Sequence, residues 1–254
     1  MTPIAWATFL CGAFLAEIIG TMAGFGAATI LTPVAAVFLD MKTAIAVVAC
    51  FHVFGNASRL RFFGRHIDWR IWRQFGLTGV IFSLAGASLT TALSSAALMA
   101  AFGIFLLLYV AVSVTVTSVA LPRSSTVLLG GGALSGSIAG LLGTGGAVRS
   151  ACLLAFGMAK EAYIGTSAAI ALLVDATRVP VYVAGGFLPG TFVLVLLSLM
   201  AVAFAGAWVG QRLVRHINPR LFRVMVLSLL AVMGVKMLWD GIRTAGTALP
   251  VSHP

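Results

Sequence analysis

A long apolar segment, residues 126–158, reads TVLLGGGALSGSIAGLLGTGGAVRSACLLAFGM, and glycines interrupt it at Gly143-Thr144-Gly145-Gly146. A transmembrane helix needs about 20 residues, so a single helix over this whole segment would overrun the bilayer by several turns. Glycine tolerates the non-helical backbone angles that a break requires. We therefore predict that the segment forms two helices folded into a hairpin.

A second long apolar segment, residues 4–39, is interrupted at Gly24-Phe25-Gly26, and the same argument predicts a hairpin there. The two breaks share one register, because a shift of 119 residues places Gly24 and Gly26 on Gly143 and Gly145. The same shift aligns two polar stretches, Asn56-Ala57-Ser58-Arg59 and Asp175-Ala176-Thr177-Arg178. Chance matches of glycine are common in membrane proteins, but this polar match is not. An internal repeat is therefore predicted, with halves at 1–121 and 126–245 and a short tail at 246–254.

The composition excludes a soluble enzyme. Hydrophobic residues make up 61% of the 254 residues and charged residues only 9%, and the mean hydropathy is +1.10. Soluble domains carry about 25% charged residues, so this chain is expected to be a helical protein that crosses the membrane several times. The net charge of +10 does not indicate nucleic acid, because the basic residues cluster between apolar segments. The three cysteines are isolated, so neither a metal nor a cofactor is expected.

Basic residues between the segments decide between two topologies. Apolar segments are predicted at 4–39, 42–63, 73–92, 97–120, 126–158, 160–184, 190–210 and 222–240. If each segment crosses the membrane once, the twelve basic residues near their ends divide six against six. If the two long segments are hairpins, ten fall on one side and only Lys42 and Arg243 on the other; the ten are Arg61, Arg65, Arg70, Arg73, Arg123, Lys160, Arg212, Arg215, Arg220 and Arg223.

Strong asymmetry of this kind is what membrane insertion favours, with the basic side in the cytoplasm. The predicted fold is therefore an all-α integral membrane protein made of two inverted repeats. Each repeat contributes a glycine-broken helical hairpin and three transmembrane helices, and both termini lie outside the cytoplasm.

Inverted repeats with broken helices are typical of transporters, whose substrate binds near the bilayer midplane where the breaks meet. The half-helices beginning near Ala27 and Ala147 would direct free N–H groups and a positive dipole end inward, which suits an anion. Alternatively, the glycines only permit close helix packing.

Four basic residues lie within the apolar segments, where each charge needs a reason. Arg149 is the strongest candidate for an anion contact, because it follows the second break with no acid nearby in sequence. Arg178 ranks second and could pair with Asp175, three residues earlier. Arg59 either has a function or extends to the membrane surface. Lys236, near a helix end, is more simply explained by extension to the membrane surface or by pairing with Asp240, four residues later.

The predicted substrate site also includes polar residues and the glycines of the breaks. Glu17 could carry a coupling proton, or it could neutralise Arg149 or another arginine. His52 and Asn56 share a helical face and are expected to form hydrogen bonds between helices. The full predicted site comprises Gly24, Gly26, Asn56, Gly143, Gly145, Gly146, Arg149, Asp175 and Arg178.

At these residues the chain resembles the sulfite exporter TauE/SafE family of membrane permeases. Each half of that family carries a glycine-rich break followed by a proline, and the matching positions are Gly24, Gly26 and Pro33 in the first half and Gly143, Gly145 and Gly146 in the second. Gly165-Thr166-Ser167 and Gly64-x-x-Ile67-Asp68-Trp69 look like two further family motifs. Two residues depart from the pattern: Cys152 stands where the second proline would be, and Arg149 replaces a usually apolar residue.

The resemblance implies a permease for sulfite, a sulfonate or a related organosulfur anion. We expect a multi-pass protein of the bacterial inner membrane whose partners are a small anionic substrate and the lipid bilayer. An enzyme is not expected, because Gly165-Thr166-Ser167-Ala168 would need a histidine on a partner helix to act as an intramembrane protease. The alternatives are a transporter of another small organic anion, an anion channel, or a membrane scaffold that transports nothing.

Overall fold

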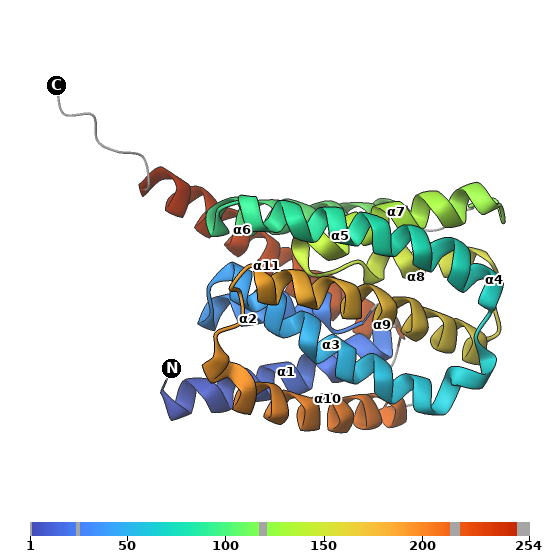
Figure 1. Ribbon diagram of the computed structural model, residues 1–254, viewed down its shortest axis with the longest axis horizontal. Coiled ribbons are helices and arrows are strands. Elements are labelled where there is room, and N and C mark those ends of the chain that lie inside the picture. Colours follow the sequence, from blue (N-terminus) through green and yellow to red (C-terminus); the bar gives the residue numbers. More distant parts are fainter. Residues whose placement is uncertain (1, 24–25, 117–120, 214–218, 248–254) are drawn as a thin grey trace.

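The computed structural model describes residues 2–23, 26–116, 121–213 and 219–247. These residues form helices and no strands. The principal helices are α1 (Pro3–Ala23), α2 (Ala28–Phe38), α3 (Met41–Phe63), α5 (Leu77–Ala92), α6 (Ser95–Thr115), α7 (Ser125–Leu142), α8 (Gly146–Ala155), α9 (Lys160–Ala184), α10 (Val193–Leu213) and α11 (Pro219–Thr247) (Figure 1). A short helix, α4 (Trp69–Ile71), continues through a π-helical turn at Trp72–Gly76 into α5.

Eight of the described helical segments are long and apolar enough to cross a membrane, which confirms a helical multi-pass membrane protein. The segment predicted at 73–92 begins earlier, at Trp69, because the Asp68 side chain accepts hydrogen bonds from the backbone N–H groups of Arg70 and Ile71 and caps a helix there. The last helix continues to Thr247, past both its predicted end at 240 and the predicted boundary at 245.

Both long segments break where the glycines predicted. α1 ends at Ala23 and α2 begins at Ala28, while α7 ends at Leu142 and α8 begins at Gly146. Gly26 and Gly143 adopt φ angles of 90° and 81°, a left-handed conformation that favours glycine over other residues.

Each break reverses the chain. A Cβ atom added at Gly20 would touch the backbone of Ala27, and one added at Gly12 would touch the Val34 side chain, so α2 packs antiparallel to α1. In the same way Gly131 lies against Cys152, which makes α8 antiparallel to α7. α2 and α8 have 11 and 10 residues, which is about half of what a crossing needs.

The hairpins place the two described chain ends at one end of the bundle. α1 begins and α11 ends at the left of Figure 1, whereas α7 and α9 begin at the right. The basic residues predicted for one side lie at or near helix ends, apart from Arg215, which lies outside the described residues. Of these ends, the end of α3, the end of α10 and the starts of α7 and α9 are at the right of Figure 1.

Helix packing follows the register of the predicted repeat. α3 packs against α9 and α6 against α11, while α5 packs on α7 as α10 packs on α1. A shift of 119 residues relates the two helices of the α3–α9 pair, and it relates α5 to α10 and α7 to α1. Two inverted halves would require such exchanged contacts, and the relation between the halves stays a prediction.

A seam of small residues joins α5 to α7. A Cβ atom added at Gly136 would collide with the carbonyl oxygen of Gly79, and one at Gly140 with that of Ser83. Together with Gly132 these glycines recur every four residues on one face of α7, which lets two helix backbones approach closely within the membrane. These three glycines of α7 therefore serve helix packing, and those of the break serve the reversal of the chain.

The arrangement predicts sidedness that labelling can test. Single cysteines introduced near Arg65 and near Arg215, in a background lacking Cys11, Cys50 and Cys152, should both react only from the cytoplasm. Cysteines at Thr2 and Gly246 should react only from outside and serve as the matched controls. Opposite sidedness of the Arg65 and Arg215 positions would contradict the inverted-repeat prediction.

Candidate anion-binding site

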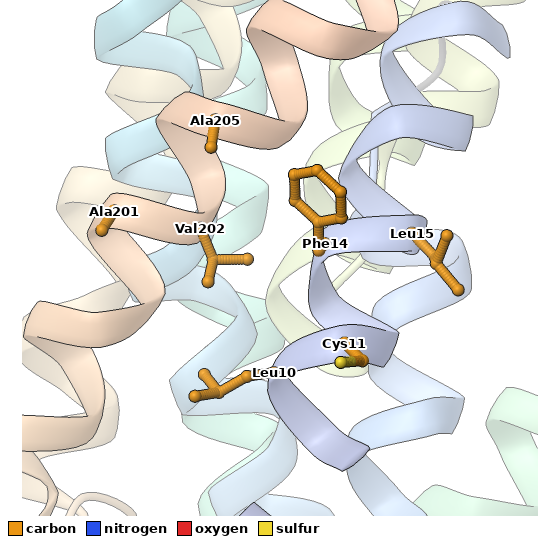
Figure 2. Close-up of a pocket in the computed structure, with 7 residues that line it drawn as sticks. All are labelled: Leu10, Cys11, Phe14, Leu15, Ala201, Val202 and Ala205. Carbon is orange, nitrogen blue, oxygen red and sulfur yellow. The ribbon is translucent and has the colours of Figure 1, made fainter. Parts of the chain in front are cut away.

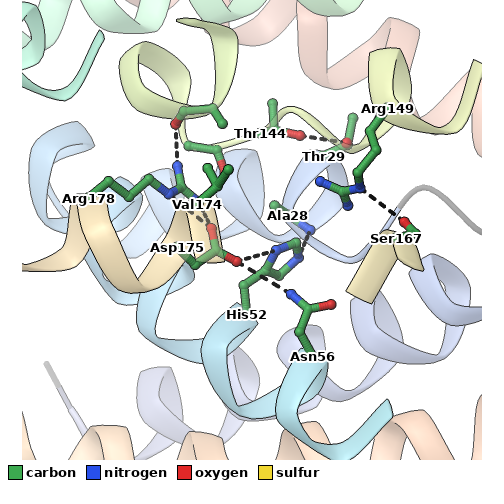
Figure 3. A network of polar contacts seen from close by, with 12 residues as sticks. Ala28, Thr29, His52, Asn56, Thr144, Arg149, Ser167, Val174, Asp175 and Arg178 are labelled. Carbon is green, nitrogen blue, oxygen red and sulfur yellow. Dashed lines mark hydrogen bonds and ion pairs between the residues drawn. The ribbon is translucent and has the colours of Figure 1, made fainter. Parts of the chain in front are cut away.

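The two breaks meet inside the bundle, between the half-helices α2 and α8. The hydroxyl oxygens of Thr29 and Thr144 lie 2.7 Å apart and share a hydrogen bond in which either residue can be the donor. Both residues are buried. Figure 3 shows this contact beside the guanidinium group of Arg149. The sequence therefore located the breaks, and the structure brings them together.

Arg149 lies in the first turn of α8 and is only 7% exposed. Its Nε donates a hydrogen bond to the Ser167 hydroxyl oxygen at 3.0 Å. Among the described residues no carboxylate lies within ion-pair distance of its guanidinium group, and its Nη atoms have no hydrogen-bond partner. Arg149 thus presents a buried positive charge and free donors where the breaks meet.

The start of α8 adds N–H groups to this charge. The Arg149 N–H bonds the Gly145 carbonyl, but the N–H groups of Gly146 and Ala147 precede the first helical hydrogen bond. Such groups, with the helix dipole, favour a negative ligand. At the start of α2, by contrast, the Ala28 N–H already donates to Nε2 of His52 at 2.8 Å.

His52 connects the start of α2 to an acid on α9. Since Nε2 accepts a hydrogen bond from a backbone N–H, it carries no proton, and the ring proton is on Nδ1 in a neutral imidazole. Nδ1 lies 3.5 Å from Oδ2 of Asp175. The side-chain amide of Asn56 also donates to Oδ2 of Asp175, at 3.4 Å. His52 on α3 thus bonds α2 and Asn56 on α3 bonds α9, which confirms the interhelical hydrogen bonds predicted for both residues.

Asp175 and Arg178 form the buried ion pair that their spacing suggested. Nε and Nη2 of Arg178 lie 3.0 and 2.6 Å from Oδ1 of Asp175. The remaining donors of Arg178 bind the carbonyl oxygens of Ala139 and Gly143 at the end of α7. Arg178 is 1% exposed and holds the C-terminal end of α7 at the break.

Glu17 pairs with Arg59, and not with Arg149. Nη2 of Arg59 donates to Oε1 of Glu17, and Nη1 donates to the Asn56 side-chain oxygen at 3.0 Å. The Thr21 hydroxyl also donates to Oε1, at 3.2 Å. Oε2 of Glu17 is buried and has no hydrogen-bond partner among the described atoms. A continuous polar chain therefore runs from Glu17 through Arg59 and Asn56 to Asp175.

The other predicted residues fall into two groups. Gly26, Gly143, Gly145 and Gly146 line the breaks, whereas Gly24 lies outside the described residues. Lys236 pairs with Asp240 at 2.5 Å on an exposed face, away from the site.

Sequence reasoning missed the contributions of Thr29, Thr144 and Ser167. The signal for Ser167 was present in the Gly165-Thr166-Ser167 motif: its hydroxyl binds Arg149, while the neighbouring Thr166 hydroxyl accepts a hydrogen bond from the Asp68 N–H at 2.9 Å.

A groove among the described residues lies away from this site. It has a volume of about 560 Å³ between α1 and α10 and is lined by Leu10, Cys11, Phe14, Leu15, Ala201, Val202 and Ala205 (Figure 2). Its wall is almost wholly apolar, so it offers no donor for an anion.

The Glu17–Arg59 pair should contribute strongly to stability. Arg59→Met would leave the carboxylate of Glu17 buried and unpaired, and breaking a buried pair costs about 3–5 kcal/mol of unfolding free energy. Glu17→Gln should cost less, because Arg59 keeps its bonds to Asn56 and Thr21. Adding Glu17→Gln to Arg59→Met should recover part of the loss.

Unfolding of the purified protein in mixed detergent micelles would measure these differences. Lys236→Met, in an exposed pair, is the matched control and should change stability by no more than about 1 kcal/mol. Equal losses in the Arg59 and Lys236 variants would contradict the prediction.

A family model described as sulfite exporter TauE/SafE matches residues 9–237. No curated protein and no solved structure matches the chain.

Proposed function

The chain belongs to the sulfite exporter TauE/SafE family of membrane transporters, and on this premise we propose that it moves a small sulfur-containing anion, such as sulfite or an organosulfonate, across the bacterial inner membrane. The substrate binds where the two broken hairpins meet. One observation carries the proposal: Arg149 is buried at that point with no acidic partner among the described residues.

The donors around Arg149 suit an oxyanion. The two free Nη groups of a guanidinium can bind two oxygens of a sulfonate or sulfite side by side. The first N–H groups of α8 lie at the same helix end as Arg149 and are further donors for an anion. The Thr29–Thr144 hydroxyl pair adds a neutral donor. Asp175 supports the site by contacting both His52 and Arg178, and Asn56 donates a hydrogen bond to Asp175.

Arg178 and His52 are positioning residues in this proposal. Arg178 binds the carbonyl oxygens that the break leaves at the end of α7, and His52 binds the N–H at the start of α2. They fix the two breaks in the bundle, so that Arg149 and the hydroxyl pair face the substrate. Movement of one repeat against the other would then expose the site to each side in turn.

Glu17 is the proposed carrier of a coupling proton. Its Oε2 is buried without a partner, and the polar chain through Arg59 and Asn56 connects it to Asp175 beside the site. Glu17→Gln should keep substrate binding but lose accumulation driven by a proton gradient. Accumulation that persists in this variant would assign coupling to another group.

Flux into liposomes containing the purified protein tests the proposal. Sulfite, sulfate, thiosulfate, taurine and sulfoacetate would be compared with lactate, a small carboxylate without sulfur. Uptake of at least one sulfur anion above lactate supports the proposal. Preference for lactate would indicate a carboxylate transporter. Flux that does not change when a proton gradient is imposed would indicate a channel.

A further inference from the structure

The positive and negative charges of the side chains buried around the site do not cancel. The described acids of this region are Glu17 and Asp175, and each is paired with one arginine, Arg59 or Arg178. His52 is neutral, because its Nε2 accepts a backbone hydrogen bond. Two negative charges therefore face three positive ones, and the excess charge belongs to Arg149.

An uncompensated charge in a low-dielectric interior is unfavourable until a ligand neutralises it. One negative charge would balance the buried groups. A second negative charge on the ligand would need another cation, and no other lysine or arginine among the described residues is buried at the breaks. Lys42, in the first turn of α3, donates to the Thr91 carbonyl oxygen instead.

The remaining donors are neutral. In the Thr29–Thr144 pair one hydroxyl donates to the other, so the proton of the second hydroxyl is free for a ligand. Together, the two Nη groups of Arg149 and this hydroxyl provide donors for three oxygens, and they carry only one full charge.

We infer that the site selects a singly charged anion, namely an organosulfonate or hydrogen sulfite, over doubly charged sulfite or sulfate. The inference rests on the proposed function and adds the charge state of the substrate to it. The site thus discriminates by charge among oxyanions of similar size and shape.

Methanesulfonate and sulfate are the matched probes, since both are tetrahedral and differ mainly by one charge. Binding to the purified wild-type protein should favour methanesulfonate by roughly tenfold or more, a factor that corresponds to about 1.4 kcal/mol. Flux of total sulfite should rise as the pH falls and hydrogen sulfite becomes the main species. Flux of methanesulfonate, which keeps its charge, should change much less over the same range.

Charge-shifted variants supply the second test. Asp175→Asn raises the uncompensated charge from one to two, so the preference for methanesulfonate should fall at least several-fold. Asp240→Asn makes the same change of net charge in the exposed pair and should leave the preference unchanged. If Asp175→Asn does not fold, the wild-type comparison decides alone.

Wild-type protein that binds sulfate as tightly as methanesulfonate would overturn the inference and leave the proposed function standing. Failure to bind or move any sulfur anion would instead overturn the proposed function, and this inference with it.

Discussion

Replacing Gly145 by leucine should reduce transport to the level of liposomes without protein. A Cβ atom at this position would collide with the carbonyl oxygen of Ser135 and lie 2.8 Å from its hydroxyl and 3.0 Å from the Cβ of Ala139. The α7–α8 hairpin could close only by displacing the start of α8, which carries Arg149. The larger leucine side chain adds to this displacement, so the site loses its geometry.

Gly26→Leu should have a similar effect for a second reason. Gly26 has a φ of 90°, where a residue with a side chain is strained by about 1–2 kcal/mol, and its Cβ would lie 3.1 Å from Cε1 of His52. The residue that holds the start of α2 would therefore move.

Two control glycines separate this effect from a general cost of substitution. Gly130 lies on α7 with open space around it, and Gly186 has a φ of 74° but no neighbour within 4 Å of an added Cβ. Gly130→Leu and Gly186→Ala should keep most of the wild-type flux. Sulfite uptake per inserted protein, with insertion measured by protease protection, would compare them. Wild-type flux in the Gly145 and Gly26 variants would show that the substrate does not bind at the breaks.

The fold was largely predictable, because its determinants are local in sequence. Composition indicated membrane helices, and glycines marked both breaks, at Gly26 and at Gly143. The 119-residue offset even aligned Asn56 with Asp175, two residues that contact each other in the structure. Contact between equivalent residues is what an axis between two inverted halves would produce.

Interactions within the site were less predictable, because they join helices distant in sequence. No local spacing connects Glu17 with Arg59, or the start of α2 with His52. Thr29 and Thr144 were not singled out, since they are 115 residues apart and no local spacing relates them. The pair of Arg178 with Asp175 was foreseeable from its spacing, but its bonds to the end of α7 depend on how α9 packs.

Among the buried arginines, Arg149 should have the largest effect on substrate binding. Arg149→Gln keeps a similar length and some hydrogen-bonding capacity but removes the charge. Loss of a charge-assisted hydrogen bond costs about 1.5–3 kcal/mol, or roughly ten- to a hundred-fold in affinity. Folding should be retained, because no described carboxylate depends on Arg149 for neutralisation. Removing an uncompensated buried charge should even stabilise the empty protein.

Arg149→Lys should restore only part of the affinity, since an ammonium group cannot bind two oxygens side by side as a guanidinium does. Arg178→Gln makes the instructive comparison. It should weaken folding first, because it leaves Asp175 unpaired and releases the carbonyl oxygens of Ala139 and Gly143. Lys236→Gln, in an exposed pair, should change neither folding nor affinity.

Calorimetric binding of methanesulfonate, together with thermal unfolding of the same samples, would separate the two effects. An Arg149→Gln protein that binds the anion as tightly as wild type would show that this charge does not hold the substrate. The anion contact would then pass to the hydroxyl pair and the N–H groups at the start of α8, which carry no full charge and would not impose a preference for single charge.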